Sequence, residues 1–188
     1  MNIRLILSLI VIIIIVLGLS ISYFFQRSRH EVVLEQKLRG NMIITSPTFQ
    51  HNGLIPFKYT CDGENINPPL EIKEIPQRTK SLALIVDDPD APMETWIHWV
   101  VWNVDPKTTQ IPENNVPDKA TEGQTSFEKS GYGGPCPPSG THRYFFKLYS
   151  LDTKLNLPSD TPKSGLLEAM ANHILAEAEL VGLYSRVK

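Results

Sequence analysis

The chain has 188 residues, a formal net charge of −2 at pH 7, 15 prolines and two cysteines. About 150 residues remain once an apolar N-terminal segment is set aside, which is the size of one ordinary domain with one core. The small charge and the scattered basic residues exclude the basic surface of a protein that binds nucleic acid. The prolines favour an all-β domain rich in loops.

The first predicted element is a membrane anchor. Residues 5–25 are apolar and uncharged, and about 20 such residues span a bilayer as a helix. A cleaved signal peptide is the alternative, because Arg4 precedes the run and residues 20–22 resemble a cleavage site. The length of the run and its aromatic end favour a retained anchor over residues 1–26.

A charged juxtamembrane linker over residues 27–40 leads to the domain, residues 41–188. Several basic residues follow the apolar run, whereas Arg4 stands alone before it. This distribution favours a single-pass membrane protein with its domain on the cytoplasmic side. Export of the domain by a signal anchor stays open.

The domain begins with a series of predicted strands. Residues 42–47 and 54–59 are predicted as short strands around a turn, and residues 70–75 as a half-buried strand because apolar and charged side chains alternate. Residues 81–86 are continuously apolar, which predicts a central strand that ends in two aspartates at one edge of the sheet.

The second half alternates strands with a long loop and a helix. Residues 96–104 are apolar on both faces, as in a central strand, and residues 105–133 form a loop of a length that is usually functional or mobile. A stiff, proline-containing loop then feeds a strand at residues 142–149.

The C-terminal pattern predicts one helix. Residues 164–173 fit it, with Leu167, Met170, Ala171 and Ile174 at helical spacing. Residues 176–184 then alternate as in a closing strand, although a continued helix fits nearly as well.

Three short motifs lie at the ends of the predicted strands. They are Asp88-Pro89-Asp90-Ala91-Pro92, Trp96-Ile97-His98, and Gly-Pro-Cys-Pro-Pro-Ser-Gly-Thr-His-Arg-Tyr at residues 134–144. Residues two apart in a strand share a face, so His142 and Tyr144 point the same way, as do Trp96 and His98. If the strands are neighbours, a site forms from two imidazoles, a phenol, an indole and aspartates.

Together with residues 60–70, these motifs resemble the phosphatidylethanolamine-binding protein family, in its bacterial and archaeal branch of Raf kinase inhibitor-like proteins. The likeness covers about residues 42–186. It implies a β-sandwich of two antiparallel sheets with a short C-terminal helix followed by a strand, here preceded by one N-terminal transmembrane helix. It also implies a short strand near residues 120–127.

The resemblance implies a ligand, too: a phosphate-bearing small molecule or lipid head group. It assigns the ligand site to Asp88, Ala91, Pro92, Trp96, His98, Cys136, His142 and Tyr144. It places both Cys61 and Cys136 near the cleft, where a disulfide is conceivable. Two separate thiols are favoured unless the domain lies outside the cytoplasm. The family more often has a second histidine or tryptophan at the position of Ile97.

The residue types suit an anion. Imidazole N–H groups, the Tyr144 hydroxyl and backbone amides of the loop at residues 134–140 are donors, and Asp88 can fix a histidine tautomer and favour its protonated form. Asp90 and Arg143 are assigned a structural role, as a buried ion pair. We therefore expect binding without turnover, cofactor or metal ion.

Two alternatives from other classes stay open. Long loops such as residues 106–130 permit a kinase or protease inhibitor that acts through its surface. Two histidines and an aspartate could instead hold a metal ion that activates water for hydrolysis. An enzyme is disfavoured because the sequence has no recognised nucleophile motif and no His-Glu-x-x-His helix.

Overall fold

The computed structural model describes residues 18, 20–27 and 41–186. The chain divides into two compact units, residues 1–39 and residues 40–188. Most of the anchor predicted over residues 5–25 lies outside the described residues. Residues 20–27 are helical, and no helix within the described ranges is long and apolar enough to cross a bilayer. The anchor and the alternative signal peptide both stay predictions.

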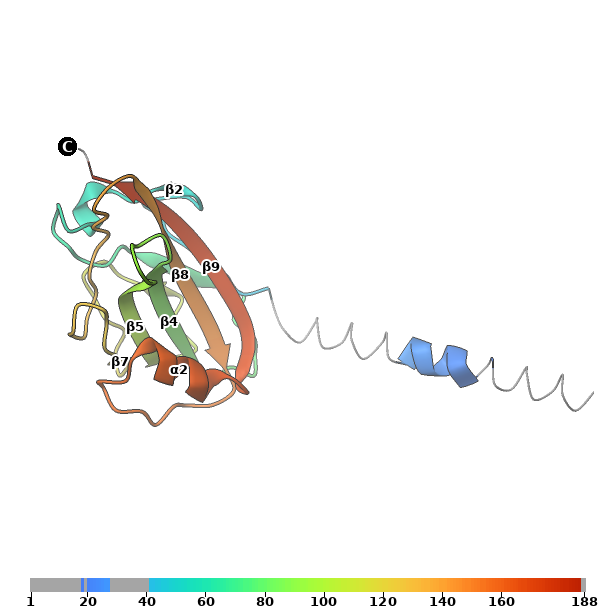
Figure 1. The fold of residues 1–188 in the computed structure, drawn as a ribbon. Helices are drawn as coiled ribbons and strands as arrows, with labels where there is room; N and C mark the ends of the chain where they lie inside the picture. The colour runs from blue at the N-terminus through green and yellow to red at the C-terminus, as the bar shows by residue number, and fades with distance from the viewer. Residues whose placement is uncertain (1–17, 19, 28–40, 187–188) are drawn as a thin grey trace, which may run out of the picture. The chain divides into compact units, whose positions relative to one another are not determined.

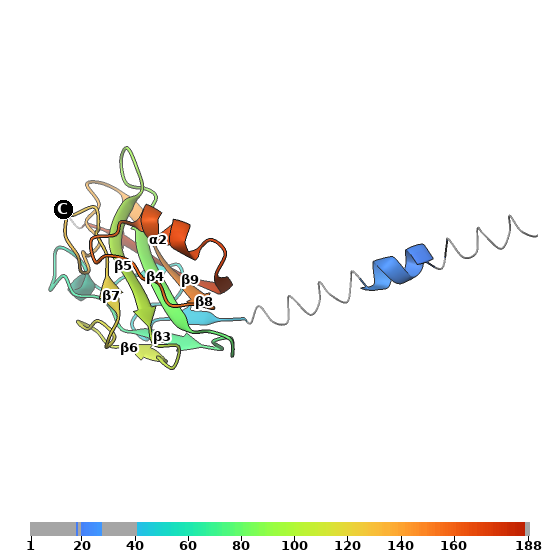
Figure 2. The same ribbon diagram turned by 90° about the horizontal axis from the view of Figure 1, so that it is seen from below.

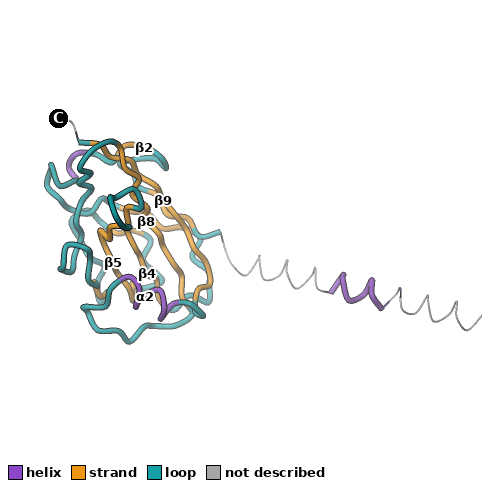
Figure 3. The backbone as a smooth tube through the Cα atoms, in the orientation of Figure 1, coloured by secondary structure: helices purple, strands orange, loops and turns teal. Residues whose placement is uncertain are grey.

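The second unit contains two β-sheets and two short helical segments (Figures 1 and 3). The three-stranded sheet has the order β1-β3-β6, and the six-stranded sheet has the order β2-β9-β8-β4-β5-β7. The strands are β1 (Ile43–Thr45), β2 (Gly53–Leu54), β3 (Leu70–Lys73), β4 (Ser81–Asp88), β5 (Trp96–Val104), β6 (Gln110–Ile111), β7 (Thr121–Glu122), β8 (Thr141–Leu151) and β9 (Ile174–Ser185). The helical segments are the 3-10 helix η1 (Phe57–Tyr59) and the α-helix α2 (Lys163–Met170). The predicted fold of two sheets with a short helix is confirmed.

Two details of the predicted sheets are wrong. The six-stranded sheet is not wholly antiparallel, because β2 pairs in parallel with β9. The strands predicted over residues 42–47 and 54–59 are not neighbours: β1 and β2 belong to different sheets, and η1 replaces the end of the second strand. Pro56 accounts for this ending, since it has no N–H to donate to a ladder.

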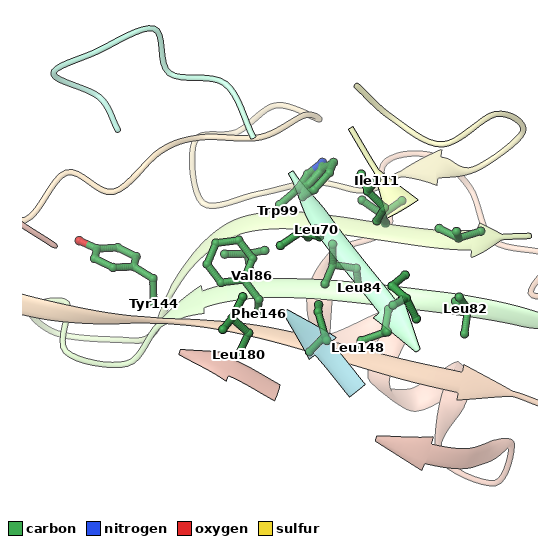
Figure 4. Packing of buried hydrophobic residues seen from close by; sticks show 14 of the residues in the cluster. Leu70, Leu82, Leu84, Val86, Trp99, Ile111, Tyr144, Phe146, Leu148 and Leu180 are labelled. Atoms are coloured by element: carbon green, nitrogen blue, oxygen red, sulfur yellow. The ribbon is translucent and has the colours of Figure 1, made fainter. Parts of the chain in front are cut away.

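β4 is buried on both faces because the large sheet is covered on both sides. Figure 2 shows α2 on one side of this sheet and β3 and β6 on the other. The side chains of Leu82, Leu84 and Val86 join the cluster that includes the small sheet (Figure 4). Those of Ala83 and Ile85 join the cluster that includes α2. Burial on both faces explains the continuous apolar run that predicted this strand.

α2 confirms the predicted helix but not its apolar face. Leu167, expected toward the core, is 37% exposed, whereas Leu166 and Met170 are fully buried. The helix ends at Met170 and Ile174 already begins β9, so the predicted face extended past the real helix. β9 pairs with β8 along its length, which confirms the closing strand.

Asp87 is fully buried near the end of β4 and is held by two lysines. Lys147 of β8 donates to its two carboxylate oxygens at 2.9 and 3.0 Å, and Lys163 of α2 donates at 2.5 Å. A buried carboxylate requires such paired cations. This ion cluster ties the first residue of α2 to the large sheet.

Candidate functional site

A cavity of about 360 Å³ lies where β4 ends and β8 begins. Its lining consists of Asp88, Ala91, Pro92, Trp96, His98, Phe127, Cys136, Pro138 and His142. The structure therefore brings together all of the ligand residues predicted from the motifs except Tyr144, which lies outside the lining. A larger hollow of about 540 Å³ along β3 and β6 contains none of the motif residues.

The order of the strands explains this convergence. β4 lies between β5 and β8. Asp88, the last residue of β4, stands opposite Trp96, the first residue of β5. On the other side, Asp87 is paired with Phe145 of β8, which places the beginning of β8, with His142, beside the end of β4. Three loops thus meet at one edge of one rigid sheet.

Asp88 and His142 form a buried pair. The Nδ1 atom of His142 lies 2.7 Å from Oδ2 of Asp88, and the residues are 7% and 3% exposed. Oδ1 of Asp88 accepts the backbone N–H of Asp90 at 2.8 Å. Because an ionised carboxylate only accepts, Nδ1 carries the hydrogen and Nε2 is the ring nitrogen left for a ligand.

His98 is held by Gly133 at two points. Its Nδ1 lies 2.6 Å from the Gly133 carbonyl oxygen, and the Gly133 N–H donates to the His98 carbonyl at 2.9 Å. Burial lowers the pKa of His98 below its ordinary value; the Gly133 carbonyl and the charges of Asp88 and Asp87 oppose this effect with less weight. A buried, neutral imidazole that donates from Nδ1 has its lone pair on Nε2.

Phe127 is a cavity residue that the motifs do not single out. It lies in the long loop after β5, and its ring contacts those of Trp96 and His98 at centroid distances of 5.5 and 5.6 Å. A Cβ atom on residue 133 would overlap this ring. Glycine at this position therefore allows the Phe127 ring to pack against the backbone of Gly133. The signal in the sequence is weak: one aromatic residue in a polar loop.

Tyr144 lies behind His98 and is fully buried. The two rings meet edge to face with centroids 5.2 Å apart. Its hydroxyl makes no well-formed hydrogen bond within the described part of the chain. Burial raises its pKa well above the ordinary value, and the Asp88 carboxylate and the Cys136 backbone lie near enough to act on it as well. In Figure 4 the hydroxyl points away from the packed apolar side chains. A buried hydroxyl without a partner is costly.

Gly134 does not supply the free amide expected of its loop. Its N–H donates to Oδ1 of Asn65 at 2.7 Å. Asn65 follows η1 and adopts a positive φ of 58°. This contact fixes the loop that leads to Cys136, and it joins residues too far apart in the chain for any local pattern to indicate.

Asp90 and Arg143 form the predicted ion pair, but the pair is not buried. The guanidinium donates from Nε and Nη2 to the two carboxylate oxygens at 2.8 and 2.7 Å, and the backbone N–H of Arg143 adds a third bond at 2.9 Å. The Arg143 side chain is 53% exposed. The hydrogen bonds from Arg143 lower the pKa of Asp90 to about 2. The pair braces the rim of the cleft.

A disulfide joins Cys61 and Cys136, in place of the two separate thiols that the sequence favoured. The sulfur atoms are 2.10 Å apart and the Cα atoms 5.4 Å apart. The Cys61 N–H also donates to the Pro135 carbonyl at 3.1 Å. The cysteines are separated by 75 positions, so no short spacing could reveal the pair. Since Cys136 lines the cavity, the bond fixes one wall of it.

Comparisons with known proteins agree with this architecture. A family model described as phosphatidylethanolamine-binding protein matches residues 45–185. A UPF0098 protein of Methanothermobacter thermautotrophicus is 51% identical over 150 residues, which cover 77% of this chain and 99% of that protein. The crystal structure of CT736 from Chlamydia trachomatis, a homologue of phosphatidylethanolamine-binding proteins, has a TM-score of 0.75 at 42% identity and covers 78% of this chain and 98% of that one. E. coli YbcL, described as a member of the mammalian PEBP family, has a TM-score of 0.73 at 30% identity, with coverage of 78% and 99%.

Proposed function

We propose, from the premise that this chain belongs to the phosphatidylethanolamine-binding protein family, that its cleft binds a phosphorylated or other anionic small molecule and releases it unchanged. The observation that carries this proposal is the convergence of Asp88, His98 and His142 in one cavity of about 360 Å³. Small-ligand sites in proteins have this order of volume and combine apolar walls with a few fixed polar groups.

His142 is the principal donor in this proposal. Its Nε2 donates to an anion when the ring carries both hydrogens, and the buried carboxylate of Asp88 at Nδ1 balances the positive charge. Asp88 contacts Nδ1 of His142, on the side of the ring opposite to the Nε2 that donates to the anion. This position explains why an acidic residue lies in an anion site.

The rest of the cavity suits the carbon atoms of a head group. Trp96, Phe127 and the two prolines of the lining, Pro92 and Pro138, provide apolar surface. Such surface is removed from water when a ligand binds, which adds affinity without adding charge.

Titration calorimetry with phosphoethanolamine and inorganic phosphate tests the proposal. We expect saturable binding to the full-length chain and loss of binding in His142→Ala. His173→Ala is the matched control, because His173 makes the same Nδ1 contact with an aspartate, Asp152, at 2.8 Å, but lies outside the cavity. No binding by the folded wild-type protein would refute the proposal and favour an inhibitor that acts through its surface loops.

The metal-dependent hydrolase has less support from the site. In the part of the chain that the structure describes, no group of three or more His, Cys, Asp or Glu residues is arranged to hold a metal ion. His98 and His142 each use Nδ1 for a protein contact.

The apolar segment at residues 5–25 adds a proposal about location. A membrane tether would hold the cleft close to the bilayer surface and raise its local concentration there. Recovery of the full-length chain in the membrane fraction, and of a chain lacking residues 1–26 in the soluble fraction, is the expected result. Recovery of both in the soluble fraction would contradict it.

A further inference from the structure

Within the proposed anion site, which the inference below rests on, His98 is held in one tautomer. It lines the cavity and is 2% exposed. A carbonyl oxygen has no hydrogen to give, so the 2.6 Å contact with Gly133 requires the hydrogen to be on Nδ1 of His98. The reciprocal bond from the Gly133 N–H to the His98 carbonyl holds the strand and the loop at fixed separation. The ring therefore cannot exchange its tautomer without losing this contact.

Nε2 of His98 is consequently an acceptor. Burial favours the neutral ring by lowering its pKa, and a neutral ring that is protonated on Nδ1 has only a lone pair on Nε2. The ring of His98 makes one hydrogen bond in the described part of the chain, from Nδ1 to Gly133. The Gly134 backbone also acts on the pKa of the ring, with less weight. Nε2 is left to meet a molecule in the cavity that His98 lines.

Asp88 adds further acceptor capacity to the same lining. Its two oxygens accept one hydrogen each, from His142 and from the backbone of Asp90, and each oxygen has a second lone pair. The lining thus contrasts two acceptors, His98 and Asp88, with the donor that His142 can provide. A ligand that satisfies both kinds of group must accept hydrogen bonds and also donate one.

We propose that the cleft selects anions that carry a P–OH group, namely phosphate monoesters or phosphate in their hydrogen-bearing form, over sulfate and over phosphodiesters, because His98 offers the ligand an acceptor. Sulfate and phosphodiesters carry no hydrogen on oxygen near neutral pH, so each would place a lone pair against the lone pair of Nε2. This inference rests on the proposed function and specifies its ligand class. It predicts that the diester of an intact phospholipid is a poorer ligand than a free phosphorylated head group.

Four probes at pH 6 separate the possibilities, because about half of a phosphate monoester carries P–OH there. Phosphoethanolamine and glycerophosphoethanolamine share an amine but differ as monoester and diester. Phosphate and sulfate are of similar size, and sulfate carries the greater charge, so a site governed by size or charge alone would not reject it. We expect titration calorimetry to give affinities for the monoester and for phosphate at least about tenfold above those for their partners.

The outcomes distinguish the two proposals. Equal affinities for phosphate and sulfate would overturn the selectivity and leave the anion site intact. Absence of binding by all four probes would overturn both. In His98→Gln, whose amide can donate as well as accept, the ratio of phosphate to sulfate affinity is expected to fall toward one. This ratio is insensitive to a uniform loss of affinity from a structural defect.

A direct measurement covers the case in which the His98 variant does not fold. Long-range ¹⁵N–¹H correlation spectra of the wild-type protein report which ring nitrogen carries the hydrogen. A protonated Nδ1 and an unprotonated Nε2 for His98 at pH 7 are expected. A hydrogen on Nε2, in either the neutral or the charged ring, would overturn the inference.

Discussion

The imidazole of His142 and the carboxylate of Asp88 meet at 2.7 Å across 54 positions of the chain. The two residues belong to neighbouring strands, β8 and β4, and the loops at the same edge enclose them. The pair is almost inaccessible to solvent.

Asp88→Asn tests the charge. The amide oxygen can still accept the hydrogen on His142 Nδ1, but the negative charge that balances an imidazolium is lost, and an NH2 group replaces the oxygen that accepts the Asp90 N–H. We expect phosphoethanolamine affinity to fall about tenfold, which is about 1.4 kcal/mol, in calorimetric titrations. Asp152→Asn, in the surface pair with His173, should bind like the wild type; an equal loss in both variants would contradict the prediction.

Tyr144→Phe tests the hydroxyl that has no partner within the described residues. Its removal eliminates a buried polar group, so the free energy of unfolding without ligand should rise by about 1 kcal/mol. Tyr184→Phe is the opposite case, because the Tyr184 hydroxyl donates to Asp62 at 2.8 Å. Urea denaturation should show a loss of stability there. A loss of stability in Tyr144→Phe would mean that the hydroxyl is already satisfied.

The disulfide provides a third prediction. A cross-link that closes a loop of 75 residues stabilises by about 4 kcal/mol in the chain-entropy account. Replacement of Cys61 and Cys136 by serine should lower the free energy of unfolding by about this amount in guanidinium titrations. Reductant should destabilise the wild type and leave the double variant unchanged; an equal effect on both would argue against the bond.

Asp87→Asn removes the charge that holds α2 to the sheet. The two lysines lose their buried partner, and we expect the free energy of unfolding to fall by roughly 2–4 kcal/mol. The exposed Asp160 is the control. Asp160→Asn should change the free energy of unfolding by less than about 0.5 kcal/mol. Chemical denaturation measures this free energy. A similar decrease in the two variants would show that the Asp87 ion cluster does not stabilise the fold.

The Asp90–Arg143 ion pair at the rim of the cleft predicts that the stability of the fold depends on pH in the acidic range. The pKa of Asp90 is lowered from 3.8 to about 2, so its contribution to stability is present above pH 3.8 and is lost as the pH falls through 2. The contribution is at most about 1 kcal/mol, because Arg143 is largely exposed. The melting temperature of Asp90→Asn should therefore approach that of the wild type between pH 4 and pH 2. A constant difference over this interval would contradict the assignment.

The sequence predicted the elements whose patterns are local. The apolar run before Asp88 and the doubly apolar strand after Trp96 each signal a central strand, because the sheet is covered on both faces. The family resemblance of the motifs then assigned the cavity residues, several of which lie at the ends of these strands. Periodicity was sufficient for the strands because each depends on a few consecutive residues.

The features that the sequence missed, or left open as it did the disulfide, depend on long-range pairing. The contact of Gly134 with Asn65, the bond between the cysteines and the parallel pairing of β2 with β9 each join segments far apart in the chain. The exposure of Leu167 has a different cause: α2 turns the face of Leu166 and Met170, and not that of Leu167, toward the core. Local patterns cannot specify any of these contacts.

The bond between Cys61 and Cys136 has one more consequence, which concerns proteolysis. It closes residues 61–136 into a covalent ring, and Asp88, Trp96 and His98 all belong to that ring. A single cut in any loop between the two cysteines, including the long one after β5, leaves both fragments attached. The walls of the cleft therefore stay part of one molecule after a nick that would divide a reduced chain in two.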